Sequence, residues 1–284
     1  MKLIKRIIFT ILSLWISQLC FASQAPTLPD SYSGYPFSAA VLATGLSGYG
    51  IISSGLNQAK IEASAVFSDD INRLSSVSIS NKGSVFFWQK LSKETTENTE
   101  ISLNRIGLIA TKESEKGYLT GLVLSYLYGN IAAWSNTPGN AYAFVSSGNG
   151  FAVDFAVNFT TYKPFIIGFN LKNILAYMFW DKYDTERLPF ALQANLQYIY
   201  KDFKAVGSYE RVYGNINQNC FNIGAEQAVN EFLTLRAGAI FRGPDIDKTA
   251  GFGVKIKQFL LSAAIRYNAD KTSLYMVTIG AVTK

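Results

Sequence analysis

The chain has 284 residues, of which 49% are hydrophobic and 14% aromatic, and its 26 Lys and Arg against 20 Asp and Glu give a formal net charge of +6. It contains two cysteines and no histidine. Without histidine, hydrolysis by a Ser-His-acid triad lacks its general base and a His-ligated zinc site is excluded. We therefore predict that the protein is not an enzyme and holds no metal or cofactor.

Residues 1–22 have the pattern of a secretory signal peptide. Three basic side chains precede an apolar stretch from Ile7 to Ile16, which is too short to span a bilayer, and cleavage is expected after Ala22. The alternatives are an uncleaved anchor helix and a lipid attached at Cys20, although a large Leu precedes that cysteine. Removing the three basic residues leaves a nearly neutral chain, so its charge does not favour nucleic-acid binding.

Residues 23–57 form the next segment, which we interpret as a plug for the domain that follows. The stretch from Tyr32 to Gly55 is rich in Gly, Ser, Ala and aromatic residues and is too short to be a domain. The alternative is an unstructured periplasmic lead-in, because chain termini are poorly ordered unless they are tied down.

From residue 58 to residue 284, apolar and polar side chains alternate with the period of two that β-strands show. No apolar run there reaches the ~18 residues of a membrane-spanning helix. The pattern instead predicts an all-β fold, a transmembrane antiparallel β-barrel of about 14 strands with one face toward lipid and the other toward a lumen. The expected strands are 58–67, 73–80, 83–91, 101–111, 117–128, 149–159, 165–173, 190–200, 203–211, 218–227, 231–241, 249–257, 259–267 and 273–282. A secreted soluble β-sandwich is the alternative.

Charged residues within these strands indicate which face points inward. Because an arginine on the lipid face costs about 2–4 kcal/mol at mid-membrane, Arg236 and Arg266 are predicted to face the lumen. Asp245 and Asp247 are predicted to lie in a turn, where Asp bonds the backbone. The longest connections, predicted to be outer loops, are 93–100, 132–147 and 175–188. Trp180 falls in the last of them and is predicted to be a loop or membrane-interface aromatic.

Short stretches at the end of the plug and along the barrel carry a family resemblance. They are Ser53-Ser54-Gly55-Leu56 with the following Gln58–Ser64, and then Phe169–Ile174, Phe232–Gly238 and Thr249–Lys255. These stretches resemble the FadL-like outer-membrane barrels, and within them the PorV/PorQ branch. The chain departs from that pattern at Lys284, where the family usually ends in an aromatic residue that marks the last strand for assembly.

The resemblance implies a monomeric outer-membrane channel for passive uptake of hydrophobic small molecules such as long-chain fatty acids. The ligand would be held at the plug, for which Leu42, Leu46, Gly55 and Leu56 are the candidate residues, and would leave sideways through a defect in the wall. Membrane lipid and the hydrophobic ligand are then the expected partners. The PorV likeness implies the alternative, a scaffold that binds proteins of a secretion or surface-attachment system.

Overall fold

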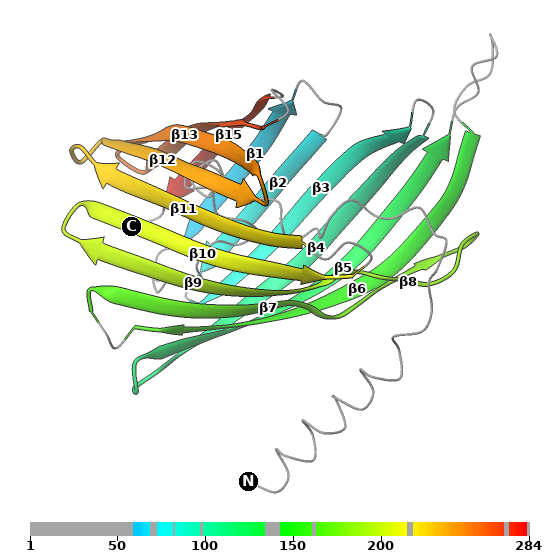
Figure 1. Cartoon of the computed structure of the whole chain (residues 1–284), viewed down its shortest axis with the longest axis horizontal. Coiled ribbons are helices and arrows are strands. Elements are labelled where there is room, and N and C mark those ends of the chain that lie inside the picture. The colour runs from blue at the N-terminus through cyan, green and yellow to red at the C-terminus, as the bar shows by residue number, and fades with distance from the viewer. Residues whose placement is uncertain are drawn as a thin grey trace, which may run out of the picture.

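The computed structural model describes residues 59–68, 73–81, 83–96, 99–133, 143–160, 163–214, 218–269 and 273–282. They form an all-β, closed antiparallel barrel of 14 strands, which confirms the predicted fold class (Figure 1). None of the described segments contains a helix with the length and apolarity that a membrane crossing requires.

Fourteen long strands and one short one make up the sheet. They are β1 Lys60–Ser68, β2 Arg73–Asn81, β3 Ser84–Thr96, β4 Thr99–Ser114, β5 Tyr118–Ala133, β6 Ala143–Phe159, β7 Phe165–Trp180, β8 Glu186–Arg187, β9 Phe190–Tyr200, β10 Phe203–Tyr213, β11 Gln218–Ala228, β12 Leu233–Arg242, β13 Asp245–Ile256, β14 Phe259–Tyr267 and β15 Ser273–Val282.

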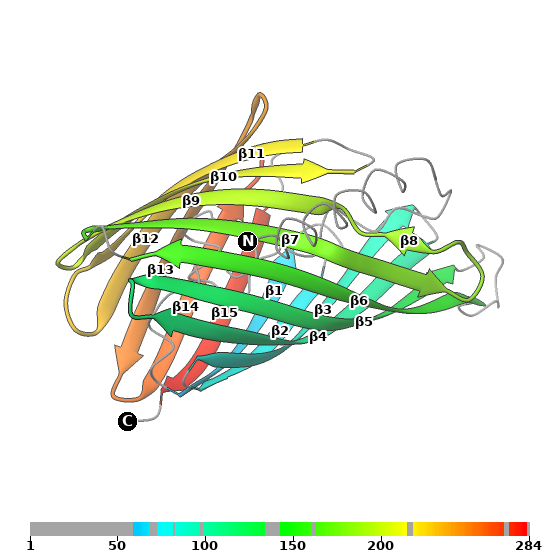
Figure 2. The same ribbon diagram turned by 90° about the horizontal axis from the view of Figure 1, so that it is seen from below.

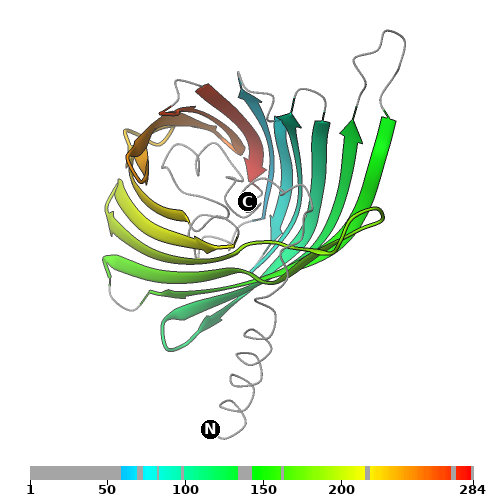
Figure 3. The same ribbon diagram turned by 45° about the vertical axis from the view of Figure 1, so that its right-hand side comes forward.

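Each long strand pairs with its neighbours in the chain, and β1 pairs with β15 to close the ring. Lys60 lies opposite Val282 in that closing pair. The short β8 pairs only with the end of β7, after which β9 takes over the pairing with β7. Figure 2 shows this succession of strands from the side, and Figure 3 shows how the ring curves.

The wall of the barrel is taller on one side than on the other. Strands β3 to β7 have 13 to 17 residues and are called the tall wall here, whereas β1, β2 and β9 to β15 have 9 to 12 and form the short wall. The tall wall includes much of the predicted outer loops: residues 93–96, 143–147 and 175–180 are strand, so the loop prediction was wrong there. Pairing continues because inward-facing apolar residues such as Ile131 and Met178 keep the strand period beyond the expected ends of their strands at 128 and 173.

The two ends of the barrel differ in their connections. At one end, called the turn end, β9 and β10 are joined only by Lys201-Asp202, and Gly83 turns the chain between β2 and β3 with φ of +87°. Glycine suits that turn because other residues rarely adopt a positive φ. At the opposite end, the loop end, β5 and β6 are separated by residues 134–142.

The outer face of the barrel is an apolar band between two groups of aromatic rings. Leu108, Leu122 and Leu124 are exposed in its middle, with exposed fractions of 42–49%. Stacked or tilted rings lie on either side: Phe151, Tyr177 and Phe179 toward the loop end, and Phe165, Tyr198 and Tyr200 toward the turn end. An apolar band flanked by aromatic girdles is the surface that transmembrane barrels present to lipid.

Candidate functional site

The inner face of the barrel carries buried polar and charged side chains, whereas the middle of the outer face is apolar. Arg236 and Arg266 both lie on this face. Arg236 Nε pairs with Glu226 Oε2 at 2.5 Å, and Arg266 Nη2 pairs with Asp247 Oδ2 at 2.5 Å. Asp247 also pairs with Arg242. It belongs to β13 and is only 3% exposed, so the turn prediction for it was wrong. The four candidate ligand residues Leu42, Leu46, Gly55 and Leu56 lie outside the described residues.

An apolar cluster lines the inner face of the tall wall toward the loop end and continues onto β1, β14 and β15. Its buried members are Val66, Leu91, Ile101, Leu103, Leu127, Ile131, Ala152, Ala176, Met178, Trp180, Leu188, Ala264 and Met276. Trp180 is 7% exposed and donates from Nε1 to Glu186 at 3.1 Å, so its prediction as a loop or interface aromatic was wrong. The signal that sequence reasoning missed was the continued alternation of Ala176, Met178 and Trp180 within the predicted loop.

Glycines of the neighbouring strand leave room for the largest side chains of this cluster. A Cβ on Gly148 would lie 2.6 Å from Cε3 of Trp180, and one on Gly150 would lie 2.1 Å from the backbone oxygen of Tyr177. Real Cβ atoms do not approach that closely, so Met178 and Trp180 lie against the wall only because β6 has no side chain at these two positions.

A buried charge layer crosses the tall wall on the turn-end side of the apolar cluster. Arg105 donates to Asp154 at 2.8 Å and to Ser125 Oγ at 2.9 Å, and the side chains of the ion pair are only 1% and 4% exposed. The Phe87 ring lies 5.7 Å from the Arg105 guanidinium carbon, which adds a cation–π contact. Beside this pair, Lys172 Nζ lies 2.9 Å from Glu210 Oε2, again buried. Sequence reasoning missed both pairs.

The charge layer coincides with an irregularity between β6 and β7. The register of the two strands shifts between Val153 and Phe155, where Asn173 has a φ of +54°. Asp154 holds the displaced backbone, because its Oδ1 accepts a hydrogen bond from the Asn173 amide at 2.7 Å. Asn173 Nδ2 in turn donates to the Pro189 carbonyl at 2.8 Å, which ties β7 to the start of β9.

On the turn-end side of the charge layer the inner face of β3 to β5 is apolar again, while the turn ends of β6 and β7, with Asn158 and Asn170, and the strands β9 to β11 are polar. The second apolar cluster consists of Phe87, Ile109, Leu119, Val123 and Ala156. The buried polar side chains on the facing strands are Gln193, Asn195, Gln197, Ser208 and Asn222. The lumen is therefore apolar along one side and lined by amides and hydroxyls along the other.

Asp181 anchors the chain where it leaves β7 at the loop end. Its carboxylate accepts hydrogen bonds from the Ser146 hydroxyl at 2.5 Å, the Ser147 amide at 2.8 Å and the Ser147 hydroxyl at 3.0 Å. The bond from Ser146 is the main reason that the pKa of Asp181 falls below its ordinary value of 3.8. At neutral pH the anchor is thus fully ionised and ties β7 to β6.

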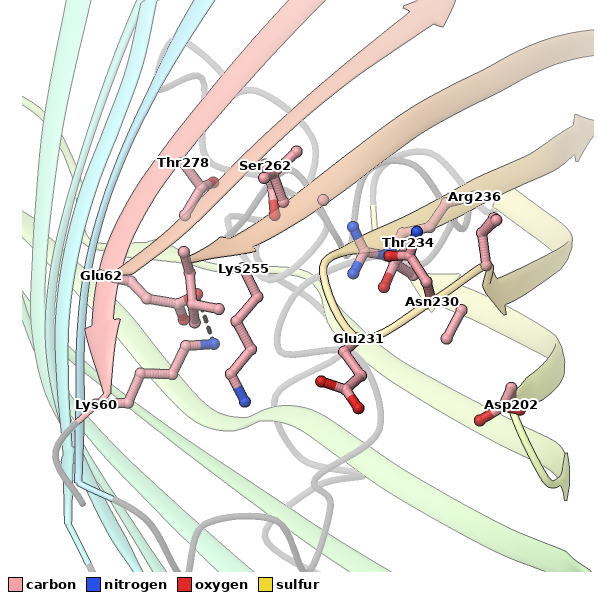
Figure 4. Close-up of a pocket in the computed structure, with 15 residues that line it drawn as sticks. Lys60, Glu62, Asp202, Asn230, Glu231, Thr234, Arg236, Lys255, Ser262 and Thr278 are labelled. Carbon is pink, nitrogen blue, oxygen red and sulfur yellow. Dashed lines mark ion pairs between the residues drawn. The ribbon is translucent and has the colours of Figure 1, made fainter. Parts of the chain in front are cut away.

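A pocket of about 530 Å³ opens at the turn end of the lumen. It lies against β1 and β12 to β15, and the turns at Asp202 and at 228–231 complete its lining (Figure 4). Among the described residues, no group of three or more His, Cys, Asp or Glu side chains could hold a metal ion.

Two solved outer-membrane channels share this architecture. No protein-family model matches the sequence, and no curated protein matches it. The CymD monoaromatic hydrocarbon channel superposes with a TM-score of 0.66 at 10% identity, covering 89% of this chain and 99% of that chain. The toluene transporter TodX of Pseudomonas putida gives a TM-score of 0.57 at 10% identity, with 89% and 98% covered. The chain shares their fold.

Proposed function

We propose that the protein is an outer-membrane channel for passive uptake of hydrophobic small molecules. In this proposal residues 1–22 are removed on export, the monomeric barrel lies in lipid, and the turn end faces the periplasm because short turns lie there in outer-membrane barrels. Residues 23–57 form the plug, where Leu42, Leu46, Gly55 and Leu56 contact the ligand. The candidate ligands are monoaromatic hydrocarbons and long-chain fatty acids.

The observation that carries the proposal is the reversal of polarity at the loop end of the tall wall. Ser102, Asn130 and Ser147 lie next to one another in register at outward positions, beyond the aromatic rings of the lipid band. At the same level the inward side chains of β4 and β5 are Ile101 and Ile131, both 2% exposed, and the inward side chain of β6 is Ser146. A wall that is polar outside and apolar inside, at the end facing the medium, suits a protein that takes up apolar molecules from water.

The charge layer supports selectivity for apolar molecules over hydrophilic ones. Arg105 and Lys172 are each matched by a buried carboxylate, so the layer presents no unpaired charge that would favour passage of an ion. The shifted register at Asp154 and Asn173 is the place in the tall wall where a sideways exit into lipid is most readily formed, because the ladder of backbone hydrogen bonds is already broken there.

In the scaffold alternative, the outer loops bind secretion-system proteins. A lumen without an apolar pocket would favour that alternative. The apolar cluster around Met178 and Trp180 therefore favours the channel.

Quenching of Trp180 tests this proposal. With Trp88 and Trp134 replaced by Phe, and Trp15 removed with the signal peptide, Trp180 is the only tryptophan left. We expect bromobenzene, a toluene-like heavy-atom quencher, to reduce its emission saturably because the ligand enters the apolar cluster.

The matched control keeps only Trp88, which lies on the outer face and donates to Asn104 at 3.3 Å. Its quenching should rise linearly as bromobenzene partitions into the surrounding detergent. Linear, non-saturable quenching at both positions would argue against a ligand site in the lumen.

A further inference from the structure

The turn-end pocket contains a buried hydrogen-bond donor without a partner. Arg236 uses Nε for Glu226, but its Nη1 is buried and has no hydrogen-bond partner among the described residues. The Arg236 side chain is 11% exposed and lies against Gly253, where a Cβ would approach Nη1 to 2.8 Å. A buried donor left without an acceptor is unfavourable, so a ligand oxygen that accepts from this nitrogen would gain a hydrogen bond that the described residues do not supply.

The groups around Arg236 make an anionic oxygen the best acceptor. Lys204 lies close to the same Glu226 carboxylate, so two cations share one acid. Lys255 is exposed on the pocket wall and forms no ion pair with a described residue, and the Ser262 hydroxyl lines the same space. Figure 4 shows the Arg236 and Lys255 side chains extending from the wall into the opening.

The remaining charged groups of the pocket do not reverse this preference. Lys60 pairs with Glu62 at 2.6 Å, so these two cancel. Glu231 and Asp202 carry negative charge, but both lie exposed on turns at the rim, where water screens them. Arg236 is therefore the most deeply buried charged group that lines the pocket, whereas Asp202 and Glu231 lie at its mouth.

The pocket is also apolar enough for more than an inorganic ion. Ala228, Val229, Val254 and Leu260 line it, and its volume of about 530 Å³ falls in the range of small-molecule sites. The geometry points to a binding site for a monocarboxylate with an apolar body, such as an aromatic acid, whose carboxylate accepts from Arg236 Nη1 and pairs with Lys255. This inference rests on the proposed function, because it places the site at the periplasmic end of the uptake route.

A set of ligands with one carbon skeleton tests the inference by calorimetry on the full chain in a non-ionic detergent. The probes are 3-phenylpropionate, 3-phenylpropan-1-ol and 3-phenylpropylamine, which differ only in the terminal group. We expect the carboxylate to bind at least tenfold more tightly than the alcohol, and the amine to bind weakest. Equal affinity for the carboxylate and the alcohol, or preference for the amine, would overturn the proposal.

Two variants locate the site. Arg236→Gln should weaken binding of 3-phenylpropionate by roughly tenfold to a hundredfold, since hydrogen bonds to charged groups have that worth. Lys255→Gln, at an exposed position without an ion pair to any described residue, should fold normally and weaken binding about fivefold. Lys248→Gln, on the outer face of the same strand, is the matched control and should have no effect.

The results that would refute the carboxylate site differ from those that would refute the channel. If bromobenzene quenches Trp180 saturably while Lys255→Gln leaves 3-phenylpropionate binding unchanged, the carboxylate site is refuted and the channel stands. If 3-phenylpropionate binds as expected and Trp180 is not quenched saturably, the turn-end pocket is a site of its own and the apolar route is refuted.

Discussion

Replacing Arg105 by methionine is expected to lower the free energy of unfolding by about 3–5 kcal/mol, because it leaves the Asp154 carboxylate buried without its counter-charge. Both side chains are at most 4% exposed and lie 2.8 Å apart. Asp154 also holds the Asn173 amide, so disturbing it should loosen the pairing of β6 and β7. Urea-induced unfolding in detergent, followed by far-ultraviolet circular dichroism, measures the change.

Two controls separate the buried charge from the general cost of substitution. Lys60→Met breaks an ion pair whose side chains are 34% and 23% exposed, and should cost no more than about 1 kcal/mol. The double variant Arg105→Met with Asp154→Asn removes both charges yet keeps an acceptor for Asn173, and should recover much of the loss. If Arg105→Met unfolds at the same urea concentration as Lys60→Met, the buried pair has no such role.

Arginine at position 124 on the outer face is expected to destabilise the barrel in lipid vesicles by about 2–4 kcal/mol. Leu124 is 49% exposed and lies in the middle of the apolar band, where it faces Leu108 across the strand pair. A charged guanidinium there would have to leave water for hydrocarbon. Reversible unfolding from vesicles of defined thickness gives the free-energy difference.

Thr120→Arg is the matched comparison for Leu124→Arg. Thr120 lies on the same face of β5 and is the next outward-facing residue after Leu122 toward the turn end. It pairs with Lys112, which already carries a charge. Near the membrane interface the cost of arginine falls to about 0–1 kcal/mol. Equal destabilisation by the two substitutions would contradict the placement of the lipid band between the two groups of aromatic rings.

The fold could be predicted because alternation is a local property of the chain. In β9 the residues Leu192 and Leu196 point outward while Gln193 points inward, and both bounds of this strand, 190 and 200, were predicted correctly. The outer and inner sets differ so clearly there that a slip of one residue would place amides in lipid. The same contrast marks β14 and β15.

The charge layer and the apolar cluster could not be predicted, because they depend on contacts between distant segments. Arg105 and Asp154 are separated by 49 residues and meet only through the pairing of β4, β5 and β6. Polar Thr and Ser residues around 132–147 have the composition of a loop, yet the strands extend into this range because Trp180 packs on Gly148. The ion pair is not visible in a short window of sequence, and the alternation of Ala176, Met178 and Trp180 marks only the strand and not what it packs against.

Uptake by intact cells tests the central claim most directly. Radiolabelled toluene should enter Gram-negative cells that carry the full chain in their outer membrane several times faster than cells that lack it. Met178→Gln, which places an amide in the apolar cluster, should remove most of the difference, while Met178→Leu should preserve it at an equal amount of folded barrel. Equal toluene uptake with and without the protein, or faster uptake of a sugar of similar size than of toluene, would contradict a channel for hydrophobic molecules.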